Sequence, residues 1–197
     1  MNHLIKTPPA TEPITLAEMR SHLGITQATD TSRDNIITGR IISARQWSEH
    51  YTRTAYITQT WTGYAVDFPY KPETCHRISL KAPLVSVTSV KYLDENGIQQ
   101  TLDPSKYLVD LVTACIVPAY NQSWPTVRAQ LNSVQVEYVS GYGNAAAVPE
   151  SIKDAVRFIV GQWEVFQSSM EGVMRPFTIP NAAKQLLDNY IDCREYF

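Results

Sequence analysis

The sequence predicts an α+β fold, in which a frame of about four helices carries an inserted, mainly antiparallel β module. Apolar residues recur at helical spacing near both ends of the chain, and from about residue 56 the period changes from 3.6 to 2, as in half-buried strands. Of the 197 residues 44% are hydrophobic and 18% charged, enough for a substantial core. We expect an extended arm at 1–13, a helical domain at 14–55 and 141–197, and the β module at 56–140.

The arm and the first helix are predicted from prolines and a capping pattern. Three prolines make residues 1–13 extended, and such an arm needs a surface to lie against, on its own chain or on a neighbour. Thr15 and Glu18 have the spacing of a capping box, in which each residue satisfies the other's backbone N–H. A short helix should follow and end near Gly24.

A second helix is expected from Asp30-Thr31 to roughly Arg53. Arg40 falls inside its apolar face, which favours a salt-bridged or snorkelling side chain over the sharper alternative of a subunit contact. The apolar side of this helix is marked at helical spacing by Ile37, Ile41, Ala44, Ser48 and Tyr51.

The β module shows alternating apolar residues and strong turn signals. Asp94-Glu95-Asn96-Gly97 holds an Asn-Gly hairpin turn between "VTSVKYL" and "IQQTL". Asp103-Pro104-Ser105 is a second turn, and two short strands are expected at Tyr107–Leu111 and Thr113–Val117. The alternating pairs that predict the other strands are Ile78/Leu80, Val85/Val87, Val90/Tyr92 and Val134/Val136/Tyr138.

Two more helices are predicted near the C-terminal end. Pro149 suits the first turn of the third helix, and Gly172, Pro176 and Pro180 mark the loop after it. The buried seam of the third helix is formed by Ile152, Val156, Ile159, Trp163 and Phe166. Asn181 can cap the last helix, one face of which carries Ala183, Leu186, Leu187, Tyr190 and Ile191.

Composition argues against several classes of function. The formal net charge is −2, from 17 basic and 19 acidic residues, so nothing calls for a polyanionic partner. The three cysteines are scattered, and no Cys/His spacing predicts zinc or a disulfide framework. No apolar run approaches the length of a membrane span, and the first residues lack the apolar core of a signal peptide. We expect a protein made and used in the cytoplasm, without metal, cofactor or membrane.

One segment imitates a nucleotide site. In "VQVEYVSGYGNAAAVPESIKDAV", Gly141, Gly143 and Ala146 have the G-x-G-x-x-(G/A) spacing of a dinucleotide-binding turn. Such a turn needs a helix directly after the glycines, whereas Val148-Pro149 delays the helix, and no second parallel strand follows. We therefore expect the glycines to turn the chain out of the last strand. An enzymatic function would require nucleotide binding here, which calorimetry with ATP and NAD would test.

The remaining motifs do not predict catalysis. The sequence has neither G-x-S-x-G nor HExxH, and its four histidines are far apart, so we expect them to be surface or hydrogen-bonded residues. Four tryptophans and eleven tyrosines exceed the needs of a core of this size, and Trp and Tyr favour protein–protein contacts. The Pro-rich arm, the "VMRPFTIP" loop and the aromatic C-terminus could reach neighbours. A subunit of an assembly explains these features better than a monomeric enzyme.

Several blocks occur in a telling order: "EPITLAEMRSHLGI", "YTRTAYITQTW", "PLVSVTSVKYLDENG", "SWP", "VQVEYVSGYGNAAAVPESIKDAV" and "LLDNYI". Together they cover nearly the whole chain, and it resembles the head–tail connector (adaptor) proteins of tailed bacteriophages, often labelled possible DNA-packaging proteins. The chain departs from that family in one place. Members often close the third helix with an aromatic-Asn-Arg-Glu run, where this sequence has Trp163-Glu164-Val165-Phe166.

This resemblance implies a structural protein of the virion neck, with no catalytic residues to carry over. Family members form a cyclic ring, usually of about twelve copies, beneath the portal. The ring extends the DNA channel and offers a platform for stopper or tail-completion proteins. DNA would pass through without sequence-specific binding, in keeping with the near-neutral charge. Assembly would take place in the cytoplasm of the host bacterium.

The alternative is a DNA-binding packaging factor, whose contact strip would be Arg33, Arg40, Arg45 and Arg53. Because Asp34 and Glu49 lie among these arginines, a solvated helix face is the simpler interpretation.

In an adaptor, the segment from about Gly172 should dock on the portal, because it is loop-like and aromatic. Deleting residues 181–197 should then abolish portal binding while the β module stays folded, and the β module would face the next neck component. The candidate contact residues are Arg40, Met174, Arg175, Pro176, Phe177, Leu186, Leu187, Tyr190, Tyr196 and Phe197.

Overall fold

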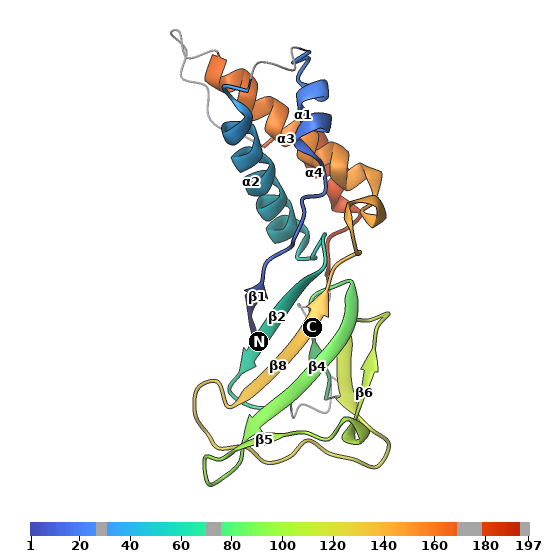
Figure 1. The fold of residues 1–197 in the computed structure, drawn as a ribbon. Coiled ribbons are helices and arrows are strands. Elements are labelled where there is room, and N and C mark those ends of the chain that lie inside the picture. Colours follow the sequence, from blue (N-terminus) through green and yellow to red (C-terminus); the bar gives the residue numbers. More distant parts are fainter. Residues whose placement is uncertain (27–30, 70–75, 169–178, 194–197) are drawn as a thin grey trace. The chain divides into compact units, whose positions relative to one another are not determined.

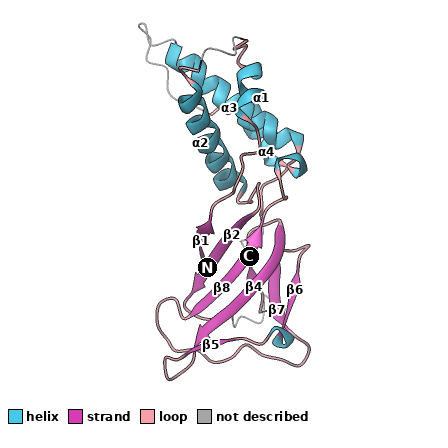
Figure 2. Cartoon of the chain, in the orientation of Figure 1, coloured by secondary structure: helices cyan, strands magenta, loops and turns pink. Residues whose placement is uncertain are grey.

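The computed structural model describes residues 1–26, 31–69, 76–168 and 179–193, with side chains placed except at 165–168 (Figure 1). Within these ranges the helices are α1 (Leu16–His22), α2 (Asp34–Thr52), α3 (Glu150–Ser168) and α4 (Asn181–Asp188). The four α-helices are grouped apart from the strands, which are accompanied by a short 3₁₀ helix at Pro104–Lys106 (Figure 2), and the predicted α+β class is confirmed.

The chain forms two compact units. The helical unit consists of Thr11–Ile57 and Gly143–Ile191, and the β unit contains Met1–Ala10 and Thr58–Tyr142, with Asp192 and Cys193. The chain therefore passes between the units several times, and one of these passages lies between Tyr142 and Gly143, in the glycine-rich segment after the last strand.

Local signals explain how the first helices begin and end. The Thr15 hydroxyl accepts the Glu18 N–H at 3.2 Å and the Glu18 carboxylate accepts the Thr15 N–H at 2.6 Å, which confirms the predicted capping box. Gly24, with φ +70°, follows the last turn of α1. The next helix begins later than predicted. It is α2, which starts at Asp34 after an N-cap residue, Arg33, that makes no side-chain cap hydrogen bond; Asp30 lies outside the described residues.

The core of the helical unit lies where α2, α3 and α4 pack together. Ile152, Val156 and Ile159 are completely buried and Trp163 is 8% exposed, which confirms the predicted seam of α3; the Phe166 side chain lies outside the described residues. The predicted cap of α4 is wrong. Pro180 occupies the N-cap position without a side-chain hydrogen bond, and Asn181 is already helical.

A five-stranded antiparallel sheet dominates the β unit. Its order is β1 (Asn2–Thr7), β2 (Gln59–Ala65), β8 (Val134–Ser140), β4 (Leu84–Leu93) and β5 (Gln99–Thr101). The first residues of the expected arm are thus a strand, in which Leu4 pairs with Thr62 and Ile5 with Trp61. The arm lies against its own chain.

A second sheet of three strands completes the β unit, in the order β3 (Ile78–Ser79), β7 (Cys115–Pro118) and β6 (Tyr107–Asp110). The segments around it are held by aromatic contacts. Phe68 stacks on Trp124 with ring centroids 4.8 Å apart, and the Trp124 indole N–H donates to the His76 carbonyl at 2.7 Å. These contacts close the interior over long connections.

The predicted hairpin between β4 and β5 is confirmed, whereas the alternation at the start of β4 is not. Gly97 has φ +80°, and its N–H donates to the Asp94 carbonyl at 2.8 Å, so Glu95 and Asn96 are the central residues of the turn and Gly97 takes the left-handed position that follows them. In β4 the register shifts between Leu84 and Ser86 and again between Val87 and Ser89. These irregularities break the period of 2, so Val85 is 46% exposed although the alternation places it on the buried face of the strand.

Candidate protein-interaction site

Three of the candidate contact residues lie on α4 or just after it within the described part of the chain, and they differ in how deeply their side chains are buried. Leu187 is completely buried, whereas Leu186 and Tyr190 are half-buried. The helix is further tied to α2 by a hydrogen bond of 2.7 Å from the Tyr51 hydroxyl to the Asp188 carboxylate. Of these three candidates, Leu186 and Tyr190 therefore keep surface that a partner can reach.

Six further candidate contact residues belong to the C-terminal part of the sequence. They lie outside the described residues: Met174, Arg175, Pro176, Phe177, Tyr196 and Phe197.

Arg40 is a salt-bridged residue, as the simpler of its two interpretations predicts. The Arg40 guanidinium and that of Arg33 both pair with Glu164, whose side chain is 6% exposed. Glu164 lies in the helix end where the sequence departs from the adaptor family, and it joins α3 to the first half of α2. A buried carboxylate between two guanidinium groups fixes the packing of these helices, because separating them would leave a charge uncompensated.

A second buried network surrounds Arg45, which is 4% exposed. Its Nε donates to Glu12 at 2.7 Å and its Nη1 to Glu49 at 2.6 Å, while Glu49 also accepts the Tyr56 N–H at 2.8 Å. Burial by itself would lower the pKa of Arg45, but the hydrogen bond to Glu12 and the charge of Glu49 outweigh it and raise the pKa. The arginine therefore stays charged inside the helical unit.

These two networks bear on the alternative of a DNA-binding strip. Arg33, Arg40 and Arg45 are each bonded to carboxylates of the same unit, and Arg45 has almost no solvent-accessible surface. Phosphate contacts require exposed guanidinium groups whose charge is not already matched. The arrangement therefore favours a structural role for Arg40 and Arg45 over DNA contact, whereas the Arg33 side chain is 42% exposed and shares Glu164 with Arg40.

The glycine-rich segment has the architecture of a turn and not of a nucleotide site. β8 is antiparallel to both of its neighbours, so no parallel βαβ unit is present there. The N–H groups of Ala146 and Ala147 donate to the Asn144 side chain at 3.0 and 3.2 Å, in a 3₁₀ turn that precedes Pro149 and α3. Those N–H groups are already satisfied and the helix begins after them, so the predicted turn is confirmed.

A groove of about 480 Å³ runs beside this turn in the helical unit. Its polar side chains are largely engaged, since Glu12 binds Arg45, Thr15 forms the capping box, and Asn144 caps the 3₁₀ turn. Among the described residues no group of His, Cys, Asp and Glu could hold a metal ion, and no described helix is long and apolar enough to cross a membrane. The groove is therefore a surface depression whose described side chains do not form a catalytic or metal-binding arrangement.

His3 is hydrogen-bonded, one of the two states expected of the histidines. The Tyr138 hydroxyl lies 2.7 Å from its Nδ1, and the two rings meet edge to face. Burial, followed by the positive charges of Lys81 and the N-terminus, lowers the pKa of His3 to about 4. The imidazole is therefore neutral at pH 7 and anchors β1 to the sheet.

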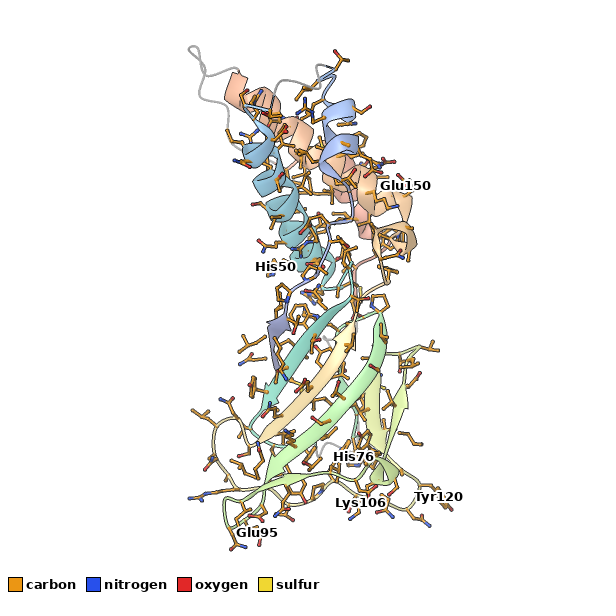
Figure 3. All side chains as sticks on the ribbon, viewed as in Figure 1. His50, His76, Glu95, Lys106, Tyr120 and Glu150 are labelled. Atoms are coloured by element: carbon orange, nitrogen blue, oxygen red, sulfur yellow. The ribbon has the colours of Figure 1, made fainter. Side chains whose placement is uncertain are left out.

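Sequence reasoning missed the exposed apolar residues of the β unit. Val112 is 92% exposed, Tyr120 88% and Leu131 80%. Val112 sits on a tight turn in which the Asp110 carboxylate accepts its N–H at 2.9 Å, and Figure 3 shows Tyr120 at the same end of the β unit as Lys106 and Glu95. The available signal was Leu111-Val112, an apolar pair within a turn, where side chains are exposed.

No protein-family model and no curated protein matches the sequence. Among solved structures, the chain is similar to one in the neck of an empty GTA particle computed with C6 symmetry, at 18% identity and a TM-score of 0.77 over 98% of this chain and 97% of that chain. It is similar to one in the virion of a native gene transfer agent (GTA) particle, at 17% identity and 0.76 over 98% and 97%. A chain in the neck of a native GTA particle computed with C12 symmetry gives 18% and 0.68 over 98% and 97%. The chain therefore shares its whole fold with chains of these particles.

Proposed function

We propose that the protein is a structural component of the neck of a tailed phage or phage-like particle, a head–tail adaptor that forms a ring beneath the portal. The observation that carries this proposal is the similarity, over 98% of the chain, to a chain in the neck of a GTA particle. The neck structures were computed with C6 and C12 symmetry, which supports a cyclic assembly of about twelve copies. The resemblance of the sequence blocks to phage adaptors points the same way.

In this role the ring extends the DNA channel and gives stopper or tail-completion proteins a surface on which to dock. The carboxylate-bound arginines and the net charge of −2 suit a wall past which DNA slides without sticking. The exposed apolar residues Tyr120 and Leu131 follow β7 and precede β8, at the end of the β unit that carries Glu95 (Figure 3), and they give that end a surface for the next neck component; Val112 lies at the other end of the β6–β7 pair. The function is structural and involves no cofactor.

Ring formation is the direct test of the proposal. Negative-stain imaging of the full chain, alone and with the portal protein of the same particle, is expected to show closed rings, in the free protein or seated on the portal. A chain that stays monomeric in both samples and does not bind the portal would contradict the proposed function.

The portal contact is best tested by point variants of α4 and the residues after it, because Leu187 and Ala183 are buried in the core of the helical unit. Deleting residues 181–197 would remove that core together with the contact surface. Replacing the half-buried Leu186 by Asp or Tyr190 by Ala is expected to weaken portal co-purification at least tenfold, with a smaller loss of stability than the truncation of a fully buried side chain causes. Leu187→Ala is the matched control, and it should instead lower the free energy of unfolding by about 2–5 kcal/mol. Unchanged portal binding by both surface variants would remove this helix from the interface.

A further inference from the structure

The five-stranded sheet has two open borders. β1 pairs with β2 on one side, and no strand lies on its other side in the described part of the chain. At the opposite border β5 pairs only with Lys91–Leu93 of β4, so among the residues that the structure describes the preceding half of β4, from Leu84 to Ser89, has a strand partner on the β8 side alone. Figure 1 shows β1 and β4 on the two sides of the central β2–β8 pair.

The two borders lie at the same level of the sheet. Ile5 of β1 is opposite Trp61 of β2, Trp61 is opposite Tyr138 of β8, and Tyr138 is opposite Val87 of β4. The adjacent residues also align across the four strands: Leu4 of β1 is opposite Thr62, Thr62 is opposite Glu137, and Glu137 is opposite Ser89 of β4. β1 and the open half of β4 are therefore the two edges of one four-strand section of the sheet, formed by β1, β2, β8 and β4.

Both borders are accessible. Leu4 is 61% exposed, Ile5 45% and Val85 46%, and Thr88 is also exposed. The Lys6 ammonium reaches back over the sheet to the Glu137 carboxylate at 2.7 Å, so it does not extend outward as the charges that usually guard an edge do. In an extended strand, backbone N–H and C=O groups of alternate residues point away from the paired neighbour, which gives each border a row of hydrogen-bonding groups.

We propose that β1 of one copy pairs with the open half of β4 in the next copy, so that the sheets of neighbouring subunits join. This inference rests on the proposed ring. The strands alternate in direction across the four-strand section, so β1 and β4 run in opposite senses. Rotation about a ring axis keeps the sense of every strand along that axis, so the new pair is antiparallel like all the others. The two borders differ, as a head-to-tail ring interface requires, whereas β1 against β1 would stop at a dimer.

The irregularities of both strands suit such a junction. The register of β1 shifts between Ile5 and Thr7, and that of β4 shifts twice between Leu84 and Ser89. Bulges increase local twist and bend a sheet, which a sheet closing around an axis needs. At about 4.8 Å per strand, four strands from each of about twelve copies would close at a diameter of roughly 70 Å, wide enough to surround a DNA duplex.

Proline variants of β1 test the backbone pairing. Successive N–H groups of a strand point to opposite sides, so one of Leu4 and Ile5 donates toward β2 and the other away from it. Proline at the outward position should leave the melting temperature within a few degrees of wild type and abolish rings, because it removes an edge donor. The matched control Leu4→Thr changes the side chain but keeps the N–H, and it should form rings normally. Amide hydrogen exchange on the wild-type full chain is the second measurement, with exchange in β1 and in Leu84–Ser89 slowing at least tenfold on ring formation.

The outcomes separate this inference from the proposed function. Rings that persist in both proline variants, or β1 amides that exchange equally fast in rings and in single chains, would overturn the strand junction and leave the ring standing. If both proline variants unfold, the exchange measurement decides. Should the wild-type chain form no ring, alone or with the portal, the proposed function fails and the junction fails with it. Dimers held through β1 would equally overturn the head-to-tail pairing.

Discussion

Replacing Arg45 by alanine is expected to lower the free energy of unfolding of the helical unit by about 3–5 kcal/mol. The arginine is 4% exposed and Glu49 is 8% exposed, and the guanidinium bonds both Glu49 and Glu12 within 2.7 Å. Its removal leaves the buried Glu49 carboxylate without a positive partner, in a place where water has little access. Urea unfolding followed by helical circular dichroism measures the loss.

A matched control for Arg45 is Arg157 on α3. It also bonds two carboxylates, Glu150 and Asp154, each at 2.7 Å, but those carboxylates are 64% and 46% exposed. Its replacement by alanine should therefore cost at most about 1 kcal/mol, the usual worth of a surface ion pair. Equal losses for the two variants would contradict a special role for burial at Arg45.

The double variant Arg45→Met with Glu49→Leu distinguishes lost charge pairing from lost volume. Because it removes Arg45 and Glu49 together and fills the space with apolar atoms, it should recover part of the stability that Arg45→Ala loses, while Glu12 and the Tyr56 N–H lose their partners. A double variant as unstable as the single one would show that packing, rather than the uncompensated carboxylate, dominates.

Patterns confined to neighbouring residues were predictable from the sequence. The capping box at Thr15 and Glu18, the hairpin turn at Asp94–Gly97 and the buried seam of α3 each depend on residues within a few positions of one another. In each case the local backbone or the helical period alone determines the outcome.

The ion-pair partners were not predictable, because they depend on the tertiary fold. Arg40 and Glu164 are 124 positions apart, and Glu12 and Arg45 are 33 apart. At helical spacing, Arg45 and Glu49 look the same whether they face water or a core. β1 was missed for a related reason, since "NHLIKT" has little alternation and becomes a strand through its pairing with β2.

Residues that contact another subunit are also difficult to predict. Hydrophobic periodicity indicates that a side chain is buried, but it does not show whether the side chain packs against its own chain or against a neighbouring one. Leu186 and Leu187 are adjacent and chemically identical, and both fall on the predicted apolar face of the last helix. One is half-buried and the other completely buried in its own unit. A surface that one copy offers to another can be identified only after the burial within each copy is known.

Acidification from pH 7 to pH 4.5 is expected to loosen β1 through His3. The folded state lowers the pKa of this imidazole from 6.5 to about 4, because the side chain is buried and lies near Lys81 and the N-terminus. Between these two values the unfolded chain binds a proton that the folded chain does not, so stability falls as the pH falls through this window. The shift corresponds to roughly 2–3 kcal/mol at pH 4.5. Protonation also places a charge beside Tyr138, the residue that holds His3 to the sheet.

His3→Phe isolates this contribution, because phenylalanine keeps an aromatic ring beside Tyr138 but does not titrate. Carboxyl groups whose pKa is lowered, such as Glu18 and Asp94, lose stabilising contacts as the pH falls further, and they do so equally in both proteins. The difference between wild type and variant in urea unfolding at pH 7 and pH 4.5 therefore reports His3 alone, and faster amide exchange in β1 locates it. An identical pH dependence in wild type and His3→Phe would show that β1 is not held by a neutral imidazole.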